Sequence, residues 1–354
     1  MKCIMFPGQG SQFVGMGKEC FDLYPEEVKI ADEILGYSTK MLCLEDVHSQ
    51  MNSTEYTQPL IYLVSALSYK KYIEYDNGVQ PDYFCGHSLG EYCALYAAGA
   101  FSLSDGLRMV KKRGELMAES VGGGMAAILN IDAGKIEKYI NEKNINNVSV
   151  ANFNAPLQTV ISGSVDEIEL MKGPLEILGA IHIRLKTSGA FHSPYMSGAK
   201  SRFGDFLSDI DFRKINIPVI SNVTAAETIQ GDLIEGLLTQ LTAPVRWTQS
   251  IRHLLDLGVS DFQELGPGRV LNKLFDQITK DYESNSQIHM NEVTQQYIDT
   301  VDWNKNISVG DEVKYIDDES MYSTRVMAHK GFNGRPVVYL NGCNGFSPIV
   351  KLKA

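Results

Sequence analysis

The first part of the chain alternates between short apolar runs and longer amphipathic segments. Apolar runs bounded by turn residues predict buried strands, whereas apolar residues at helical spacing predict amphipathic helices. We therefore expect strands over Lys2–Phe6 and Pro81–Cys85, and helices over Glu91–Ala98 and Ser104–Glu119. Strands that alternate with helices are typical of an α/β domain.

The pattern changes after the glycine run at residues 122–124. The following elements are expected to be strand, helix, strand, strand, helix and strand, over Met125–Ile131, Ala133–Lys143, Val148–Phe153, Leu157–Ser162, Asp166–Leu178 and Ala180–Lys186. This order predicts a ferredoxin-like (βαββαβ) subdomain, residues 125–189. Strands expected over Ile217–Val223 and Val259–Leu265 resume the α/β pattern. The subdomain is thus predicted to be inserted in a main domain formed by residues 1–124 and 190–283.

A polar segment, Asp281–Gln287, predicts a linker. Beyond it lie short apolar runs separated by Gly, Asn and Asp, over Val309–Ile316, Thr324–His329, Val337–Leu340 and Ile349–Leu352. Such runs predict short strands. We expect a small β-rich C-terminal domain over residues 288–354, of a barrel-like kind.

Composition and charge limit the function. With 354 residues, 44% hydrophobic and 21% charged, the chain is an ordinary globular protein of two or three domains. Its net charge of −11 argues against a nucleic-acid partner, since there is no basic excess to neutralise phosphates. No apolar run approaches the ~18 residues of a membrane span, and the N-terminus does not resemble a signal peptide, so no membrane partner is expected.

The six cysteines are spaced singly, without the paired spacing of metal sites, so no metal is expected. Several fall in apolar stretches, which indicates reduced core thiols and a cytoplasmic location.

The segment Gly86–Gly90 reads Gly-His-Ser-Leu-Gly, which fits the G-x-S-x-G nucleophile elbow between a strand and a helix. A tight turn there would expose Ser88, and the helix N-terminus would offer amide donors to a developing negative charge. The alternative is a surface turn whose serine caps the helix.

A serine nucleophile needs a base, and His192 is the best candidate among the seven histidines. It follows the last expected strand of the inserted subdomain, where the chain returns to the main domain. A structural histidine is the alternative. His87 adjoins the serine but should point away from it. Arg113, on the expected amphipathic helix, could hold a carboxylate in a bidentate pair, unless it is simply solvated.

Together, eight motifs in one order resemble the malonyl-CoA:acyl carrier protein transacylase family of fatty-acid and polyketide synthesis. The resemblance covers about residues 1–280, and the motifs are Phe6–Gln12, Thr57–Pro59, Gly86–Glu91, Arg113–Gly114, Gly124–Ala127, Ala190–Ser193, Pro244–Trp247 and Glu264–Gly268. The resemblance implies an α/β-hydrolase-like main domain that carries a ferredoxin-like subdomain.

The resemblance also assigns roles. Ser88 would be the nucleophile and His192 its base and then acid, oriented by the backbone carbonyl of Gln240. Backbone N–H groups of Gln9 and Leu89 would form the oxyanion hole.

The remaining roles that the resemblance implies concern the substrate. Arg113 would bind the malonyl carboxylate, and Gln58 and Asn152 would be polar pocket residues. Phe191 would crowd the α-methyl group of methylmalonyl. The implied reaction is ping-pong malonyl transfer from malonyl-CoA to an acyl carrier protein, without a resident cofactor.

Several alternatives stay open. The chain could be an acyl hydrolase that clears carrier-bound acyl groups, although Arg113 favours transfer, or an idle docking subunit. Gly36–Ser38 and Thr57–Lys70 look closer to trans-acting polyketide enzymes than to housekeeping fatty-acid enzymes. Polyketide synthase subunits are therefore further candidate partners. The C-terminal domain could be a stabilising cap or a docking module.

Overall fold

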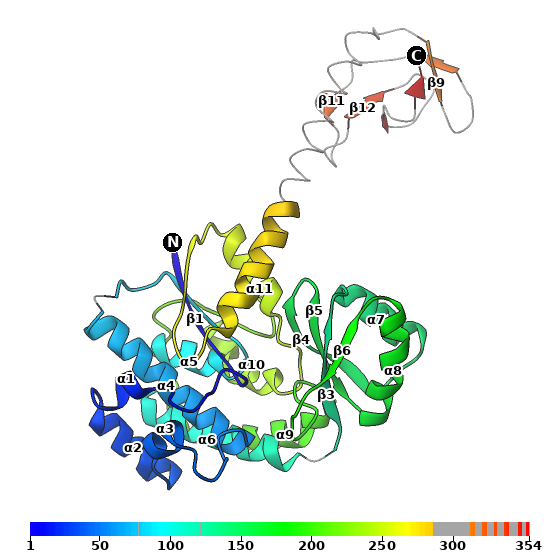
Figure 1. The fold of residues 1–354 in the computed structure, drawn as a ribbon. Helices are drawn as coiled ribbons and strands as arrows, with labels where there is room; N and C mark the ends of the chain where they lie inside the picture. Colours follow the sequence, from blue (N-terminus) through cyan, green and yellow to red (C-terminus); the bar gives the residue numbers. More distant parts are fainter. Residues whose placement is uncertain are drawn as a thin grey trace. The chain divides into compact units, whose positions relative to one another are not determined.

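The computed structural model describes residues 1–76, 78–120 and 122–285, together with six short strands between residues 312 and 353. By their contacts, Met1–Thr279 form one compact unit and Lys280–Ala354 a second. The N-terminal unit contains a parallel and an antiparallel sheet, each with its own helices (Figure 1).

The parallel sheet has four strands in the order β7-β2-β1-β8, that is Val219–Ile220, Tyr83–Gly86, Lys2–Phe6 and Asp261–Glu264. In β1, Ile4 and Phe6 belong to one hydrophobic core and Cys3 and Met5 to another. All four side chains are fully buried. Side chains of a strand point alternately to the two faces of its sheet, so helices must cover both faces, as is usual for parallel sheets.

Helices of this unit surround the parallel sheet (Figure 1). They are α1 (Lys18–Phe21), α2 (Pro25–Leu35), α3 (Thr39–Leu44), α4 (Thr54–Glu74), α5 (Gly90–Ala97), α6 (Leu103–Glu119), α9 (Ser197–Leu207), α10 (Leu233–Gln240) and α11 (Trp247–Asp256), with the 3-10 turns η1 (Pro194–Met196) and η2 (Gln230–Asp232) and a last helix that starts at residue 270. Within the described residues, no helix combines the length and the apolar character needed to cross a membrane.

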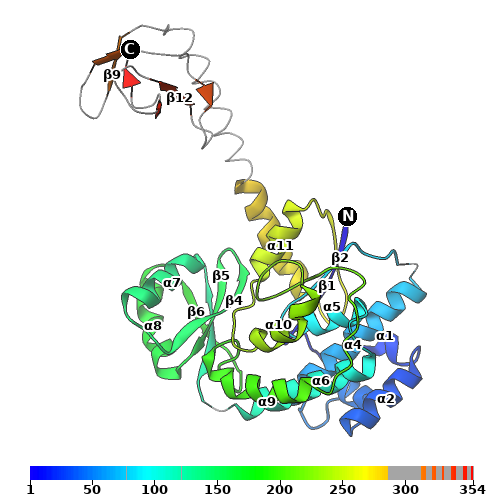
Figure 2. The ribbon, with the colours of Figure 1, turned by 180° about the vertical axis from the view of Figure 1, so that it is seen from behind.

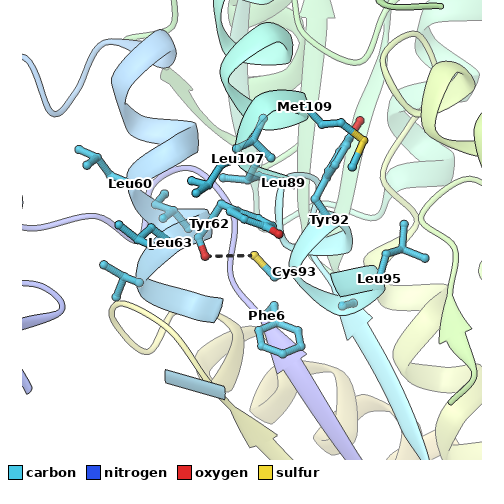
Figure 3. Close-up of a cluster of buried hydrophobic side chains, with 14 of the residues drawn as sticks. Phe6, Leu60, Tyr62, Leu63, Leu89, Tyr92, Cys93, Leu95, Leu107 and Met109 are labelled. Atoms are coloured by element: carbon cyan, nitrogen blue, oxygen red, sulfur yellow. Dashed lines mark hydrogen bonds between the residues drawn. The ribbon is translucent and has the colours of Figure 1, made fainter. Parts of the chain in front are cut away.

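The larger core lies between β1 and helices α4, α5 and α6 (Figure 3). Helix α6 begins where the Ser102 hydroxyl accepts a hydrogen bond from the Asp105 N–H, which satisfies one of the free donors of the first turn. Tyr62 of α4 and Tyr92 of α5 are both fully buried in this core. Leu89, just before α5, also points into it (Figure 3) and is 1% exposed. Its side chain thus anchors the turn that carries Ser88.

The second sheet is antiparallel, with strand order β4-β5-β3-β6. Its elements follow one another as β3 (Gly124–Leu129), α7 (Ala133–Glu142), β4 (Val148–Ala155), β5 (Gln158–Gly163), α8 (Val165–Ile177) and β6 (Ile181–Arg184). The strand and helix order expected for residues 125–189 is therefore found. Both helices lie on the same face of the sheet (Figure 2) and cover a core that includes Ile128, Ile136 and Ile168. The other face contributes Met125 and Val160 to the larger core.

Two expected segments differ from the structure, one strand in its length and the linker in its conformation. The strand expected over Ile217–Val223 shortens to the two residues of β7, because Ser221 starts a turn in which its carbonyl accepts from the Ala225 N–H. The linker expected over Asp281–Gln287 is also wrong for residues 281–285, which continue a helix that starts at residue 270. Polar residues suit an exposed helix as well as a linker, so composition alone could not separate them.

The C-terminal unit contains two antiparallel sheets of three strands each. Strands β10 (Met321–Ser323), β9 (Glu312–Tyr315) and β14 (Leu352–Lys353) form one, and β11 (His329–Lys330), β12 (Pro336–Tyr339) and β13 (Phe346–Pro348) form the other. Of the described strands, β9, β12 and β14 overlap expected strands, whereas β10 and β13 were not anticipated. Most of the strand expected over Thr324–His329 lies outside the described residues.

Candidate active site

Ser88 stands on a sharp turn between β2 and α5. Its backbone has φ of +52°, a left-handed conformation that non-glycine residues rarely adopt. A Cβ on Gly86 would lie 2.0 Å from the Gly90 backbone, and one on Gly90 would lie 2.0 Å from the Phe6 carbonyl oxygen. Neither position has room for a side chain. The two glycines therefore allow the close packing of strand, turn and helix that presents the Ser88 hydroxyl.

Ser88 and His192 are in direct contact. The distance between Ser88 Oγ and His192 Nε2 is 2.8 Å, and His192 Nδ1 lies 2.8 Å from the backbone oxygen of Gln240, the last residue of α10. A carbonyl oxygen can only accept, so Nδ1 carries the hydrogen and Nε2 is free to accept from the serine hydroxyl. This arrangement suits proton abstraction from Ser88.

The imidazole is neutral at ordinary pH. Burial, followed by the positive charge of the neighbouring Arg113, lowers the pKa of His192 to about 3. Only a neutral imidazole can act as a base. The site therefore keeps its base in the active protonation state over a wide pH range.

Arg113 of α6 is 1% exposed and points at the serine. Its Nη1 donates to Gln58 Oε1 at 2.7 Å, and its Nη2 donates to Ser88 Oγ at 3.1 Å and to Gln240 Oε1 at 3.0 Å. The Arg113 Nε has no partner among the described residues, and the Tyr92 ring lies 5.4 Å from the guanidinium carbon.

No carboxylate of the described residues lies within 4.0 Å of the Arg113 guanidinium. A buried charge without a counter-ion is costly. The buried Glu91 carboxylate reaches Arg113 only through the Gln240 side chain, so the geometry leaves the guanidinium open to an anionic partner from outside the chain. The alternative of a solvated Arg113 is wrong. Met109, Leu116 and Met117, all buried, share its face of α6 at spacings of three and four residues. Apolar residues at this spacing place Arg113 on the buried face of the helix, so the sequence could have predicted its burial.

Two residues that line the same cavity have backbone N–H groups without hydrogen-bond partners in the described part of the chain. The amides of Gln9 and Leu89 form no hydrogen bond among the described residues, and both residues line the cavity beside Ser88. Uncommitted amides next to a nucleophile are suited to hold an oxyanion.

The cavity has a volume of about 550 Å³, which is within the usual size range of ligand pockets. Gln58, Asn152 and Phe191 all line it, together with Met125 and Val160 of the antiparallel sheet. Phe191 is 5% exposed, and Asn152 lies on β4. The cavity thus opens between the two sheets of the N-terminal unit.

Two residues outside the expected set, Asn222 and Glu91, also hold the site. Asn222 accepts from the Ser88 N–H at 2.7 Å through Oδ1 and donates to the Gly86 carbonyl at 2.6 Å through Nδ2. Glu91 is buried, accepts from the Gln240 side chain and from the Asn222 N–H, and has its pKa raised to about 7 by burial. His87 also lines the cavity, and its Nε2 lies 2.8 Å from Asn154 Oδ1.

The sequence predicted only that the backbone carbonyl of Gln240 would contact His192. Its side chain also accepts from Arg113 and donates to the Ser88 carbonyl and to Glu91. Glu91 is the last residue of the Gly86–Glu91 motif, so the sequence could have pointed to it as a member of this network. Asn222 had no signal in the sequence, because it reaches Ser88 across 134 residues.

A strand–turn–helix serine, a neutral histidine on its hydroxyl and two free amides define a class of enzymes that transfer acyl groups through a serine ester. Comparison with known proteins identifies the family. Residues 4–303 match the family model of the acyl transferase domain, and the chain belongs to this family.

The chain is 46% identical over 283 residues to the polyketide biosynthesis malonyl CoA-acyl carrier protein transacylase BaeC of Bacillus velezensis, covering 79% of this chain and 98% of BaeC. Among solved structures, the malonyl CoA-acyl carrier protein transacylase of Burkholderia pseudomallei is similar with a TM-score of 0.76 and 42% identity, over 79% of this chain and 98% of that one. A malonyl-transacylase in complex with a type II PKS acyl-carrier protein, PlMCAT:AntF, has a TM-score of 0.75 and 33% identity, over 79% and 93% of the two chains.

Proposed function

We propose that the chain is a malonyl-CoA:acyl carrier protein S-malonyltransferase that works through an ester on Ser88. The observation that carries the proposal is Arg113, a buried guanidinium 3.1 Å from the Ser88 hydroxyl with no carboxylate partner in the described part of the chain. An acyl group that ends in a carboxylate would supply the missing charge and place its thioester near Ser88. The names of the relatives agree with malonyl as that acyl group.

In the first half-reaction, Ser88 Oγ attacks the thioester carbonyl of malonyl-CoA while His192 Nε2 takes the hydroxyl proton. The amides of Gln9 and Leu89 hold the oxyanion, and each such donor is worth roughly 10²–10³ in rate. When the carbon–sulfur bond breaks, His192 returns the proton to the coenzyme A sulfur. Malonyl-Ser88 remains.

In the second half-reaction, the phosphopantetheine thiol of the carrier protein loses its proton to His192 and attacks the ester. The carbon–oxygen bond to Ser88 breaks, and Ser88 recovers the proton. This is a ping-pong cycle, and coenzyme A and the carrier are its substrates rather than resident cofactors.

Selectivity has two sources in this proposal. An acetyl group would leave the Arg113 charge unpaired, which disfavours it against malonyl. The Phe191 ring, buried in the cavity wall, would oppose the α-methyl of methylmalonyl. The same arginine favours transfer over hydrolysis of neutral acyl groups, which would not use it.

The proposed partners are malonyl-CoA and an acyl carrier protein of a polyketide pathway, with synthase subunits as further partners. The polyketide assignment is supported by the name of BaeC, and the carrier by the complex of a similar transacylase with its carrier protein. We also propose a cytoplasmic location, because the five described cysteines that are buried are free thiols.

We further propose that the main domain is α/β-hydrolase-like and that residues 125–189 are a ferredoxin-like subdomain. The parallel order β7-β2-β1-β8 and the antiparallel order β4-β5-β3-β6 support these two assignments. The β-rich residues 288–354 would form a separate C-terminal domain, which the division of the chain near Lys280 supports.

Mass spectrometry of the intact protein after mixing with malonyl-CoA alone tests the proposal. We expect one malonyl adduct, located on Ser88 by peptide mapping, lost on addition of holo carrier protein and missing in Ser88→Ala. A persistent adduct in the Ser88→Ala variant would show that the nucleophile is another residue.

A further inference from the structure

The charge in the active-site cavity comes from two side chains at different depths. Among the residues that line it, Arg113 and Lys186 are the cations, and there is no Asp or Glu. Arg113 is buried beside Ser88, whereas Lys186 is exposed. A chain of net charge −11 thus has a cavity that is free of carboxylates and positive at both its inner and its outer end.

The backbone around Lys186 is tied down although its side chain is exposed. It follows β6, and the N–H of its neighbour Leu185 donates to the Met125 carbonyl at 2.9 Å. On the other side, Thr187 Oγ1 donates to the Gly189 carbonyl at 3.2 Å. The ammonium group of Lys186 forms no ion pair or hydrogen bond with any described residue. The Lys186 ammonium group at the cavity mouth is therefore free to pair with a ligand.

We propose that Lys186 is a positioning residue that pairs with the phosphate at the far end of the pantetheine arm. This inference rests on the proposed function, because both thiols of that reaction lie on the same arm. In malonyl-CoA the arm ends in the diphosphate of coenzyme A, and in the carrier protein it ends in a phosphodiester. With the malonyl carboxylate on Arg113 and the phosphate on Lys186, two cations fix both ends of an otherwise flexible substrate and so orient its thioester.

The neutral groups at the mouth fit the same ligand. Gln12 and Asn52 line the cavity and contact each other through side-chain amides, at 3.0 Å. Neither repels an anion. The pairing with Lys186 takes place at an exposed rim, so its contribution to binding is modest and falls with ionic strength.

Single-turnover acylation of Ser88, followed over a range of substrate concentrations, tests the inference with two substrates that differ only beyond the pantetheine arm. For Lys186→Gln we expect the half-saturating concentration of malonyl-CoA to rise about two- to fivefold with little change in the limiting rate, and the half-saturating concentration of phosphate-free malonyl-pantetheine to stay unchanged. In Lys186→Arg the half-saturating concentration of malonyl-CoA should stay close to the wild-type value. Lys172→Gln, which removes an exposed lysine of α8 that does not line the cavity, should leave both substrates unchanged.

Transfer from malonyl-Ser88 forms the second arm of the test, with holo carrier protein compared with free pantetheine as acceptor. A loss in the malonyl-CoA arm alone assigns Lys186 to the coenzyme A diphosphate, a loss in the carrier arm alone assigns it to the phosphodiester, and a loss in both assigns it to both. Equal losses with phosphate-free substrates, or no loss in either arm, overturn the inference. If wild-type protein forms no malonyl-Ser88 in the same assay, the proposed function itself is wrong.

Discussion

Replacing Arg113 with alanine should change the acyl preference of the enzyme rather than simply abolish activity. In the structure, the guanidinium is buried and its three hydrogen bonds go to neutral oxygens, those of Ser88, Gln58 and Gln240. Its charge is therefore available for the carboxylate of the acyl group. Acetyl-CoA has no such carboxylate, so it should gain little from the arginine.

The size of the effect follows from the burial. Removing one partner of a buried, hydrogen-bonded charge pair costs about 2–5 kcal/mol. At about 1.4 kcal/mol for each factor of ten, kcat/KM for malonyl-CoA should fall by about 30-fold to several thousandfold. For acetyl-CoA we expect a change within about tenfold. Part of the change expected for acetyl-CoA comes from His192, because loss of the Arg113 charge removes one of the causes that lower the pKa of His192.

The assay is single-turnover acylation of Ser88 with malonyl-CoA and acetyl-CoA, followed by intact-protein mass spectrometry. Arg108→Ala is the matched control, since Arg108 lies on the same helix but is exposed and paired with Asp105 at 3.1 Å. Near-ultraviolet circular dichroism checks that the Arg113→Ala core is intact. If malonyl and acetyl transfer fall by the same factor, Arg113 has only a structural role and the reasoning is refuted.

Two further predictions concern the base and the turn. Because the pKa of His192 is lowered to about 3, kcat/KM for acylation should not decline between pH 7 and pH 5 as it would with an ordinary histidine. Glu91, whose pKa is about 7, titrates in this window, so the profile is measured in Glu91→Gln as well. An acid limb near pH 6.5 in both proteins would contradict the prediction. In Asn222→Ala, the Ser88 N–H and the Gly86 carbonyl lose their side-chain partner. We expect a loss of about 1–3 kcal/mol in unfolding free energy, seen as a lower urea midpoint. Acylation should be slower, while the ratio of kcat/KM for malonyl-CoA to kcat/KM for acetyl-CoA stays unchanged. A changed ratio would show that Asn222 contacts the acyl group.

Local sequence determined the elements that carry the site. The apolar run Lys2–Phe6 became β1 with the predicted bounds, and the helix predicted over Ser104–Glu119 became α6, shifted by one residue at its start. These predictions succeed because strand and helix periodicity express which faces are buried. The elbow was readable for a similar reason: the two flanking glycines are required by contacts only a few residues apart or with the adjacent strand.

Tertiary structure alone decided which side chains meet at Ser88. His192 lies 104 residues from it along the chain, and Gln240 lies 152 residues away. Motif resemblance could name these residues, but it could not give the neutral state of His192 or the side-chain network of Gln240. Both depend on desolvation and on the Arg113 charge, which exist only once the sheets pack together. The tertiary structure also decided that Lys186 lines the active-site cavity without a partner among the described residues. Periodicity predicts which faces are buried, but it does not predict which distant groups come close to one another.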